Sequence, residues 1–222
     1  MNSKERILTA LSCGQPDRVP IFELYISQSS IVRLANLLMP ERVKVSSEKD
    51  RFGQEGLEIL HLYSLLVDEL GLDSTGTNFS MGIEPIAEDI GRDKYGTVYH
   101  LSEYGEPMPF EGPINGPSDI KGFDMVSKLE IEDFAGVQYV IEQVGKDKAH
   151  FVSITDPFKV SWRRRGGMQD LLMDYVLNPG LVHGLSRIAT DFDMAAIDMA
   201  LQVGADVIIV PGDLAGEETT IM

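Results

Sequence analysis

The feature that most constrains the fold of this chain is an alternation of short apolar runs with longer amphipathic segments. The short runs have strand composition and cover residues 19–25, 72–79, 150–155 and 206–210. The longer segments repeat their apolar residues at helical spacing, and they cover the stretch before Gly14 and residues 29–39, 54–70, 131–144, 168–177 and 181–203. Strands that alternate with helices form parallel sheets with right-handed crossovers. The pattern therefore predicts an α/β fold.

Two architectures of this class fit the alternation, a doubly wound sheet and a (β/α)8 TIM barrel. A dinucleotide-binding sheet carries a glycine-rich phosphate turn after its first strand, and a nucleotidase carries a P-loop. The sequence contains neither motif. We therefore favour the (β/α)8 barrel, and the chain supplies about four of the eight strands that close such a barrel.

One stretch interrupts the alternation. Residues 93–96 have turn chemistry and residues 97–101 have strand composition, which predicts a β-hairpin around 88–102. Residues 106–117 are rich in proline and glycine, and we expect them to be irregular. The prediction is a single domain over residues 1–222, the N-terminal portion of a barrel with this hairpin as an insertion.

The charge and the apolar pattern exclude several classes of partner. A net charge of −16 argues against nucleic acid, because phosphate backbones require a basic surface. No apolar run approaches the ~20 residues that cross a bilayer, and the N-terminus resembles an amphipathic helix more than a signal peptide. The single cysteine, Cys13, fits a reducing compartment. We therefore expect a cytoplasmic location.

Four segments carry a family resemblance when they are taken together and in order. They are residues 4–20 (KER to QPDRVP), 91–99 (GRDKYGTVY), 156–167 (DPF to GG) and 204–216 (GAD to GDLAG). They resemble the entry helix and first strand, the hairpin, the loop after the third strand and the fourth helix–strand junction of the uroporphyrinogen decarboxylase superfamily. The first segment is most similar to the methyltransferase branch of that superfamily.

The resemblance implies a (β/α)8 barrel and two kinds of activity. Members of the superfamily include cofactor-free decarboxylases of uroporphyrinogen. They also include zinc methyltransferases that move methyl groups between a corrinoid protein and a thiol or methoxylated substrate. In that branch the His and Cys zinc ligands lie in the second half of the barrel, so we expect no cofactor in this chain. Zinc and a corrinoid partner are expected for a full-length relative.

With only about half of the barrel strands, the chain is expected to be a fragment, a truncated product or half of an assembly. An unclosed barrel leaves its last strand as a bare apolar edge, which favours pairing. We therefore expect a homo-oligomer or a complementary half-barrel as possible partners, beside a small-molecule substrate. The chain alone is expected to be inactive.

Zinc ligation within this chain is not predicted. A catalytic zinc needs about three protein ligands that converge on one point. The available side chains are spread widely without ligand-like spacing, and they are Cys13, His61, His100, His150 and His183. We interpret them as ordinary structural residues.

Classical uroporphyrinogen decarboxylation is also not favoured. The resemblance implies arginines just after the first strand and a carboxylate after the second. Residues 23–28 contain no arginine and residues 74–79 contain no carboxylate. A polyanion would meet Glu23, which opposes it by Coulomb repulsion. A decarboxylase-like enzyme and a non-catalytic half-barrel binding module remain open as alternatives to the methyltransferase.

Barrel enzymes place their chemistry at the carboxyl ends of the strands, and four polar residues are predicted there. Asp213 lies between Gly212 and Gly216 and is the candidate catalytic residue, although a turn aspartate has the same pattern. The candidates for substrate binding are Glu23, Asn78 and Asp156. Glu23 could equally be a solvated rim carboxylate, and Asp156 could cap the next helix.

Residues 163–165 are three consecutive arginines and form the one dense cationic spot of the sequence, next to Trp162. Trp162 could stack on a flat ligand, and Arg163 and Arg165 could hold carboxylates or amides at the barrel mouth. The alternative is a solvated basic face that offsets nearby acids.

Overall fold

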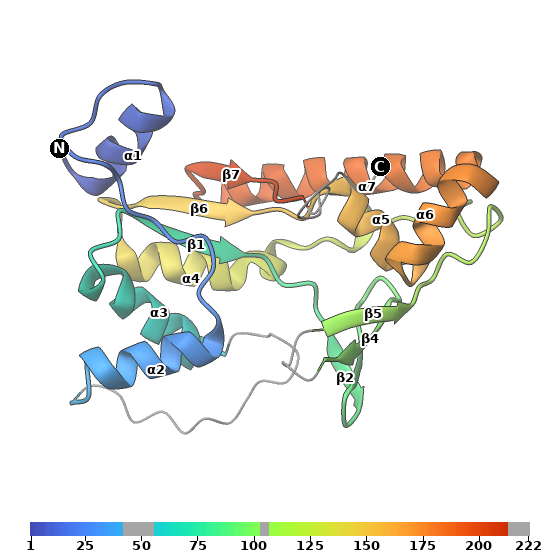
Figure 1. The fold of residues 1–222 in the computed structure, drawn as a ribbon, viewed down its shortest axis with the longest axis horizontal. Helices are drawn as coiled ribbons and strands as arrows, with labels where there is room; N and C mark the ends of the chain where they lie inside the picture. The colour runs from blue at the N-terminus through green and yellow to red at the C-terminus, as the bar shows by residue number, and fades with distance from the viewer. Residues whose placement is uncertain (42–55, 103–106, 213–222) are drawn as a thin grey trace.

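A computed structural model describes residues 1–41, 56–102 and 107–212, and it contains two sheets (Figure 1). The first is a three-stranded parallel sheet in the order β1-β6-β7, formed by Ser74–Asn78, Ala149–Ser153 and Val207–Ile209. The second is a four-stranded antiparallel sheet in the order β2-β3-β4-β5, formed by Glu84–Ala87, Ile90–Arg92, Val98–Leu101 and Pro107–Glu111. It lies on the side toward which the parallel strands point.

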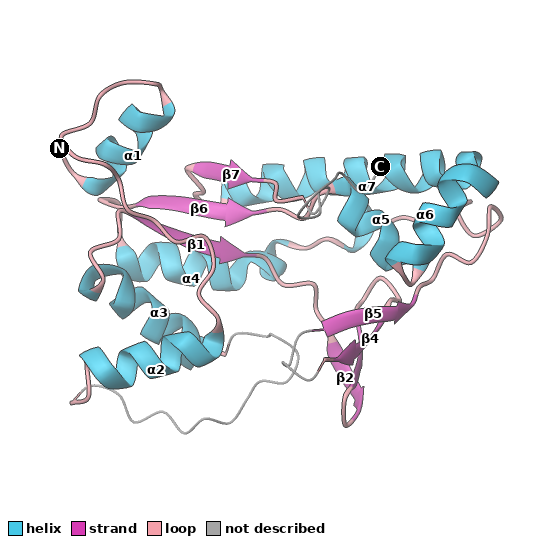
Figure 2. Ribbon diagram, in the orientation of Figure 1, coloured by secondary structure: helices cyan, strands magenta, loops and turns pink. Residues whose placement is uncertain are grey.

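Seven α-helices within the described residues surround these sheets (Figure 2). They are α1 Ser3–Leu11, α2 Gln28–Leu38, α3 Leu57–Glu69, α4 Ala135–Val144, α5 Pro157–Arg165, α6 Met168–Leu177 and α7 Pro179–Gln202. Two short 3-10 helices, Val126–Lys128 and Ile131–Phe134, precede α4. None of the described helices combines the length and the apolar character that crossing a bilayer requires.

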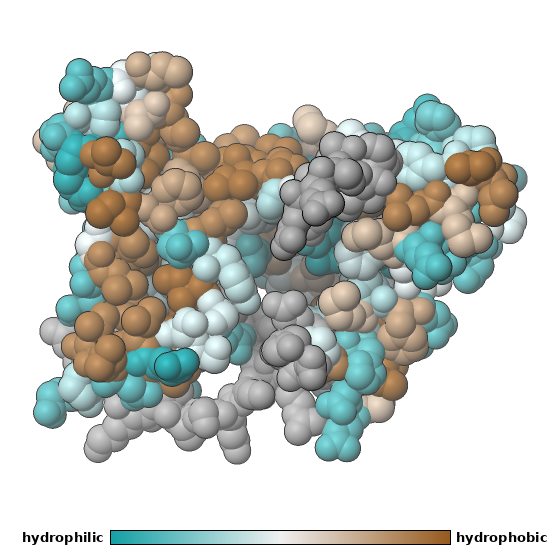
Figure 3. All heavy atoms as spheres, viewed as in Figure 1, coloured by the Kyte–Doolittle hydropathy of each residue, from teal (hydrophilic) through white to brown (hydrophobic). Residues whose placement is uncertain are grey.

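Different helices pack on the two faces of the parallel sheet. On one face Val152 of β6 packs with Val137 of α4 and Phe192 of α7 in the main apolar core. The opposite face carries Phe151, which packs with Ile7 of α1, while Val207 of β7 is only partly buried. Figure 3 shows apolar side chains gathered over β6 and β7, next to α1.

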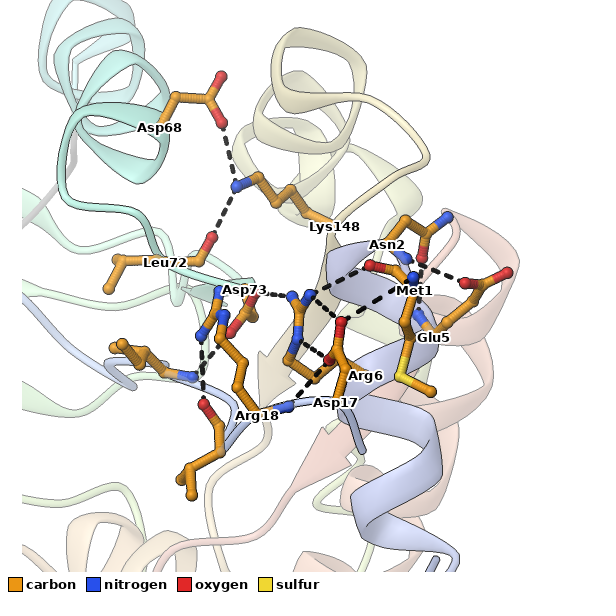
Figure 4. A network of polar contacts seen from close by, with 12 residues as sticks. Met1, Asn2, Glu5, Arg6, Asp17, Arg18, Asp68, Leu72, Asp73 and Lys148 are labelled. Atoms are coloured by element: carbon orange, nitrogen blue, oxygen red, sulfur yellow. Dashed lines mark hydrogen bonds and ion pairs between the residues drawn. The ribbon is translucent and has the colours of Figure 1, made fainter. Parts of the chain in front are cut away.

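The beginning of the parallel strands is held by an ion-pair network (Figure 4). Asp73 is fully buried just before β1, and its carboxylate accepts hydrogen bonds from Arg6 at 2.6 Å and Arg18 at 2.8 Å. Arg6 also pairs with Asp17 at 2.6 Å. Burial opposes the charge on Asp73, but the Ile21 N–H and Arg6 outweigh it and lower the pKa of Asp73. The network ties the N-terminal segment to the sheet.

The predicted first strand, residues 19–25, is wrong: this segment is not a strand. Its backbone exchanges two hydrogen bonds with Asp73, since the Ile21 N–H donates to the Asp73 carboxylate at 2.8 Å and the Ile21 carbonyl accepts from the Asp73 N–H at 2.6 Å. Further on, the carbonyls of Glu23 and Leu24 lie directly against Gly76, where a side chain would not fit. The segment runs beside β1, with Ile21 at Asp73 and Leu24 at Gly76, but it forms no ladder with that strand. The described parallel sheet therefore has three strands, not four.

The expectation that residues 106–117 are irregular is also partly wrong. Residues 107–111 form β5, which pairs with β4 alone and therefore lies at the edge of its sheet. An edge strand tolerates Pro107 and Pro109 because the N–H groups on its outer side need no partner. The predicted hairpin around 88–102 is present as the centre of this larger sheet.

Candidate functional site at the ends of the parallel strands

A hollow of about 470 Å³ opens where β1 and β6 end. Asn78 is the last residue of β1, and Ser153 is the last residue of β6. Both line the hollow, together with Thr155, which follows β6, and Tyr99 of β4. The parallel sheet and the antiparallel sheet thus contribute to one site. In α/β proteins the carboxyl ends of parallel strands are the usual place for a ligand.

Positively charged side chains also line the hollow. Lys159 and Arg163 lie one turn apart on α5, and both line the hollow. Among the described residues that line it, none is an aspartate or a glutamate. This is unexpected in a chain with a net charge of −16. The site therefore presents cations and neutral polar groups to a ligand.

The three consecutive arginines have three different environments. Arg164 is 1% exposed, and its Nη1 donates to both oxygens of Asp93 at 3.0 and 2.8 Å and to the Thr97 hydroxyl at 2.7 Å. Arg165 donates from Nε to Asp174 at 2.6 Å and does not line the hollow. Arg163 makes no ion pair or side-chain hydrogen bond within the described part of the chain.

The environment of Arg163 disfavours an unpaired charge. Its Nε is buried without a hydrogen-bond partner. Burial, with the neighbouring charge of Arg164, lowers the pKa of Arg163 below its usual value. Tyr99 lies beside it, and its hydroxyl donates to Asp93 at 2.8 Å. Burial raises the pKa of Tyr99 to about 12, so this phenol stays neutral at physiological pH.

The remaining predicted site residues lie in separate parts of the structure. Asp156 is buried and caps α5, because its carboxylate accepts the Lys159 N–H at 3.0 Å. Trp162 lies in the apolar cluster that joins α5, α6 and α7. Glu23 is exposed and lines a separate, more open hollow beside Ser27 and Leu72. Asp213 lies outside the described residues. Of the predicted residues, Asn78 and Arg163 are brought together at the strand ends.

Two residues of interest were missed by sequence reasoning. Lys159 lies four positions before Arg163, a spacing that places both side chains on one face of a helix once residues 157–165 are known to be helical. Asp193 is buried in α7, and neither of its oxygens is hydrogen-bonded within the part of the chain that the structure describes. No sequence signal marks Asp193, because its position on the apolar side of α7 depends on the packing of α5.

The histidines do not form a metal site in the described residues. His150 is buried between the Thr75 hydroxyl at 3.0 Å and the Gly145 carbonyl at 2.9 Å, and burial lowers its pKa. His61 contacts the Tyr139 hydroxyl at 3.3 Å. Within residues 1–41, 56–102 and 107–212, no three His, Cys, Asp or Glu side chains converge as metal ligands would. Zinc does not fit the residues seen here.

The fold and the site define an α/β protein whose parallel strands end at a cationic hollow. Among solved structures, the chain is similar to a methyltransferase from Methanosarcina mazei, with a TM-score of 0.62 and 19% sequence identity. The similarity covers 95% of this chain and 58% of that chain, so this chain spans a little over half of its length. No protein-family model matches the sequence, and no curated protein is similar to it. The likeness therefore concerns the fold.

Proposed function

We propose that this chain is the N-terminal part of a barrel methyltransferase in the uroporphyrinogen decarboxylase superfamily, and that it supplies the substrate-binding wall of the active site. One observation carries the proposal: a chain that superposes on a methyltransferase over 95% of its length has its polar hollow at the carboxyl ends of its parallel strands. That end is where barrel enzymes hold their substrates. Transfer linked to zinc and a corrinoid is the finer form of the proposal.

The role of the described residues is to bind and orient the substrate. Asn78, Ser153 and Thr155 offer hydrogen bonds from the strand ends, and Lys159 and Arg163 offer positive charge from α5. The described residues bring together no set of side chains that could hold zinc. The metal ligands belong, in this proposal, to a part of the active site that these residues do not form.

The methyl donor is tested by mixing the isotopically labelled chain with methylcobalamin and recording backbone NMR spectra. The proposal expects shifts for Asn78 and Ser153, which line the hollow, and no shifts for residues of the Asp73 network at the other end of the strands. Uroporphyrinogen is incubated with the chain in parallel, and the carboxyl groups of the product are counted. Loss of carboxyl groups contradicts the methyltransferase. Inertness toward both compounds favours a binding module without catalysis.

A decarboxylase-like enzyme is the second candidate, and one observation favours it. The residues after the expected first strand contain no arginine, but Lys159 and Arg163 place cations at the hollow from α5 instead. A carboxylate-rich substrate would meet these charges. The product analysis described above separates this candidate from the first.

Metal analysis gives an independent check. We expect the 222-residue chain, incubated with zinc and then desalted, to retain far less than one zinc per chain. The physical reason is that its described histidines are committed to other contacts or lie apart. Stoichiometric zinc that survives desalting would contradict the assignment of the ligands to another part of the site.

A further inference from the structure

We infer that the hollow binds the anionic group of a small organic acid through the guanidinium of Arg163. The inference rests on the proposed function, because it names the substrate class of the same hollow. Arg163 lines the hollow and has no carboxylate partner among the described residues, whereas its neighbours Arg164 and Arg165 are paired with Asp93 and Asp174. Of the three, only Arg163 is available to a ligand.

The cost of leaving Arg163 unpaired points to a ligand. A guanidinium whose Nε is buried away from water needs an anion or hydrogen-bond acceptors to offset the lost hydration. The Nε atom has none in the structure. The nearby carboxylates do not supply this partner. Asp93 is bound by Arg164 and Tyr99. Asp156 caps α5 through Oδ1, and its Oδ2 has no hydrogen-bond partner among the described residues, so it does not pair with Arg163 either. The carboxylate of a ligand would supply the missing acceptors, because its two oxygens match the planar fork of a guanidinium.

The walls of the hollow define the rest of the ligand. Aromatic and apolar side chains line it beside the cations, including Tyr25, Phe79, Tyr99 and Ile154. Such walls accept a flat or apolar body and leave its charged end to α5. A volume of about 470 Å³ suits a molecule of the size of a substituted benzoate. The shared chemistry is an anionic head on an apolar body, and the head is a carboxylate, a sulfonate or a phosphate.

Binding is measured by calorimetry or NMR titration of the 222-residue chain with four probes: benzoate, methanesulfonate, inorganic phosphate and uncharged benzamide. Benzoate should bind at least about tenfold more tightly than benzamide, which has the same shape without the charge. Phosphate binding without benzoate binding would overturn the organic acid. Equal binding of benzoate and benzamide would overturn the role of charge, and this comparison needs no mutant.

Two variants assign the effect to a residue. R163Q removes the charge and keeps the apolar stem, and it should weaken benzoate binding about tenfold or more. R163K should retain part of the affinity, because it keeps a point charge without the fork. R187Q, at an exposed arginine of α7 away from the hollow, removes the same charge from the molecule and should leave the affinity unchanged. Equal affinities in R163Q and R187Q would overturn the inference.

The inference and the proposed function can fail separately. Benzoate binding that depends on Arg163, in a chain whose spectrum ignores methylcobalamin, would leave this anion site and remove the methyltransferase. A response to methylcobalamin with no preference for benzoate over benzamide would support the methyltransferase and remove the anion site.

Discussion

Asp193 is a buried residue of α7, and neither of its carboxyl oxygens has a hydrogen-bond partner among the described residues. Burial, with the negative charge of Asp156 behind it, raises the pKa of Asp193 from 3.8 to about 8. The folded chain therefore holds a proton that the unfolded chain releases. The stability that comes with this proton is complete below about pH 3.8 and is lost as the pH rises through about 8, at up to about 1.4 kcal/mol per pH unit.

The test is D193N, which keeps the shape of the side chain and cannot ionise. We expect the free energy of unfolding of D193N to exceed that of the natural chain by an amount that grows from pH 5 to pH 8 and then levels off. Urea denaturation at each pH measures this difference, and the other carboxylates cancel in the comparison. D191N, at an exposed carboxylate two positions away on α7, should run parallel to the natural chain. A constant offset for D193N would contradict the buried neutral form.

At the scale of elements, Gly112 permits the antiparallel sheet to dock on α5. A side chain at this position would overlap the Arg164 carbonyl and the backbone of Gly166, neither of which can rotate away. A hydrogen bond also joins the two elements here, because the Ile114 N–H donates to the Arg164 carbonyl at 3.1 Å. We expect G112A to lower the free energy of unfolding by about 1–3 kcal/mol through overpacking.

The same substitution should reach the ligand site, because α5 carries Arg163 and must move to relieve the overlap. Thermal denaturation and benzoate titration of G112A measure the two effects. The matched control is G116A, since a side chain at Gly116 meets nothing within 4 Å. A G112A chain as stable as G116A would show that the sheet docks on α5 without needing this close approach.

Sequence reasoning predicted the elements whose causes are local. The bounds of α6 and the long α7 follow from helical periodicity. It failed where the cause lies far along the chain. Residues 19–25 have strand composition, but their backbone partners at Asp73 and Gly76 were unknown.

The same limit applies to the candidate site. A run of three arginines says nothing about which of them meets a carboxylate, because Asp93 lies 71 positions from Arg164. The position of Asn78 at the site could be predicted from the sequence, because it follows from the end of a predicted strand and the carboxyl ends of parallel strands share one edge. The hollow could not be predicted from the sequence, because it depends on the antiparallel sheet, which brings Tyr99 to that edge.

At the scale of the whole molecule, the two ends of the parallel sheet have separate tasks. The ends where the strands begin carry the network of buried Asp73 and Arg6 with the exposed Arg18, in which every charge is paired. The ends where they finish carry Arg163, whose charge is not paired with any of the described residues. The first arrangement stabilises the fold, and the second is poised for a ligand at the expense of stability.

This separation predicts that stability and binding can be lost independently. D73N leaves Arg6 and Arg18 without their shared anion, and breaking a buried pair of this kind costs about 3–5 kcal/mol. Its affinity for benzoate should nevertheless stay within about twofold at temperatures where circular dichroism shows it folded, a span that corresponds to less than about 0.5 kcal/mol. R163Q should show the opposite result, because it removes a partly desolvated charge that has no ion pair within the described residues. Its free energy of unfolding should equal or exceed that of the natural chain while benzoate binding falls. Loss of benzoate binding in folded D73N would mean that the two ends are coupled through β1, and the division of tasks would not hold.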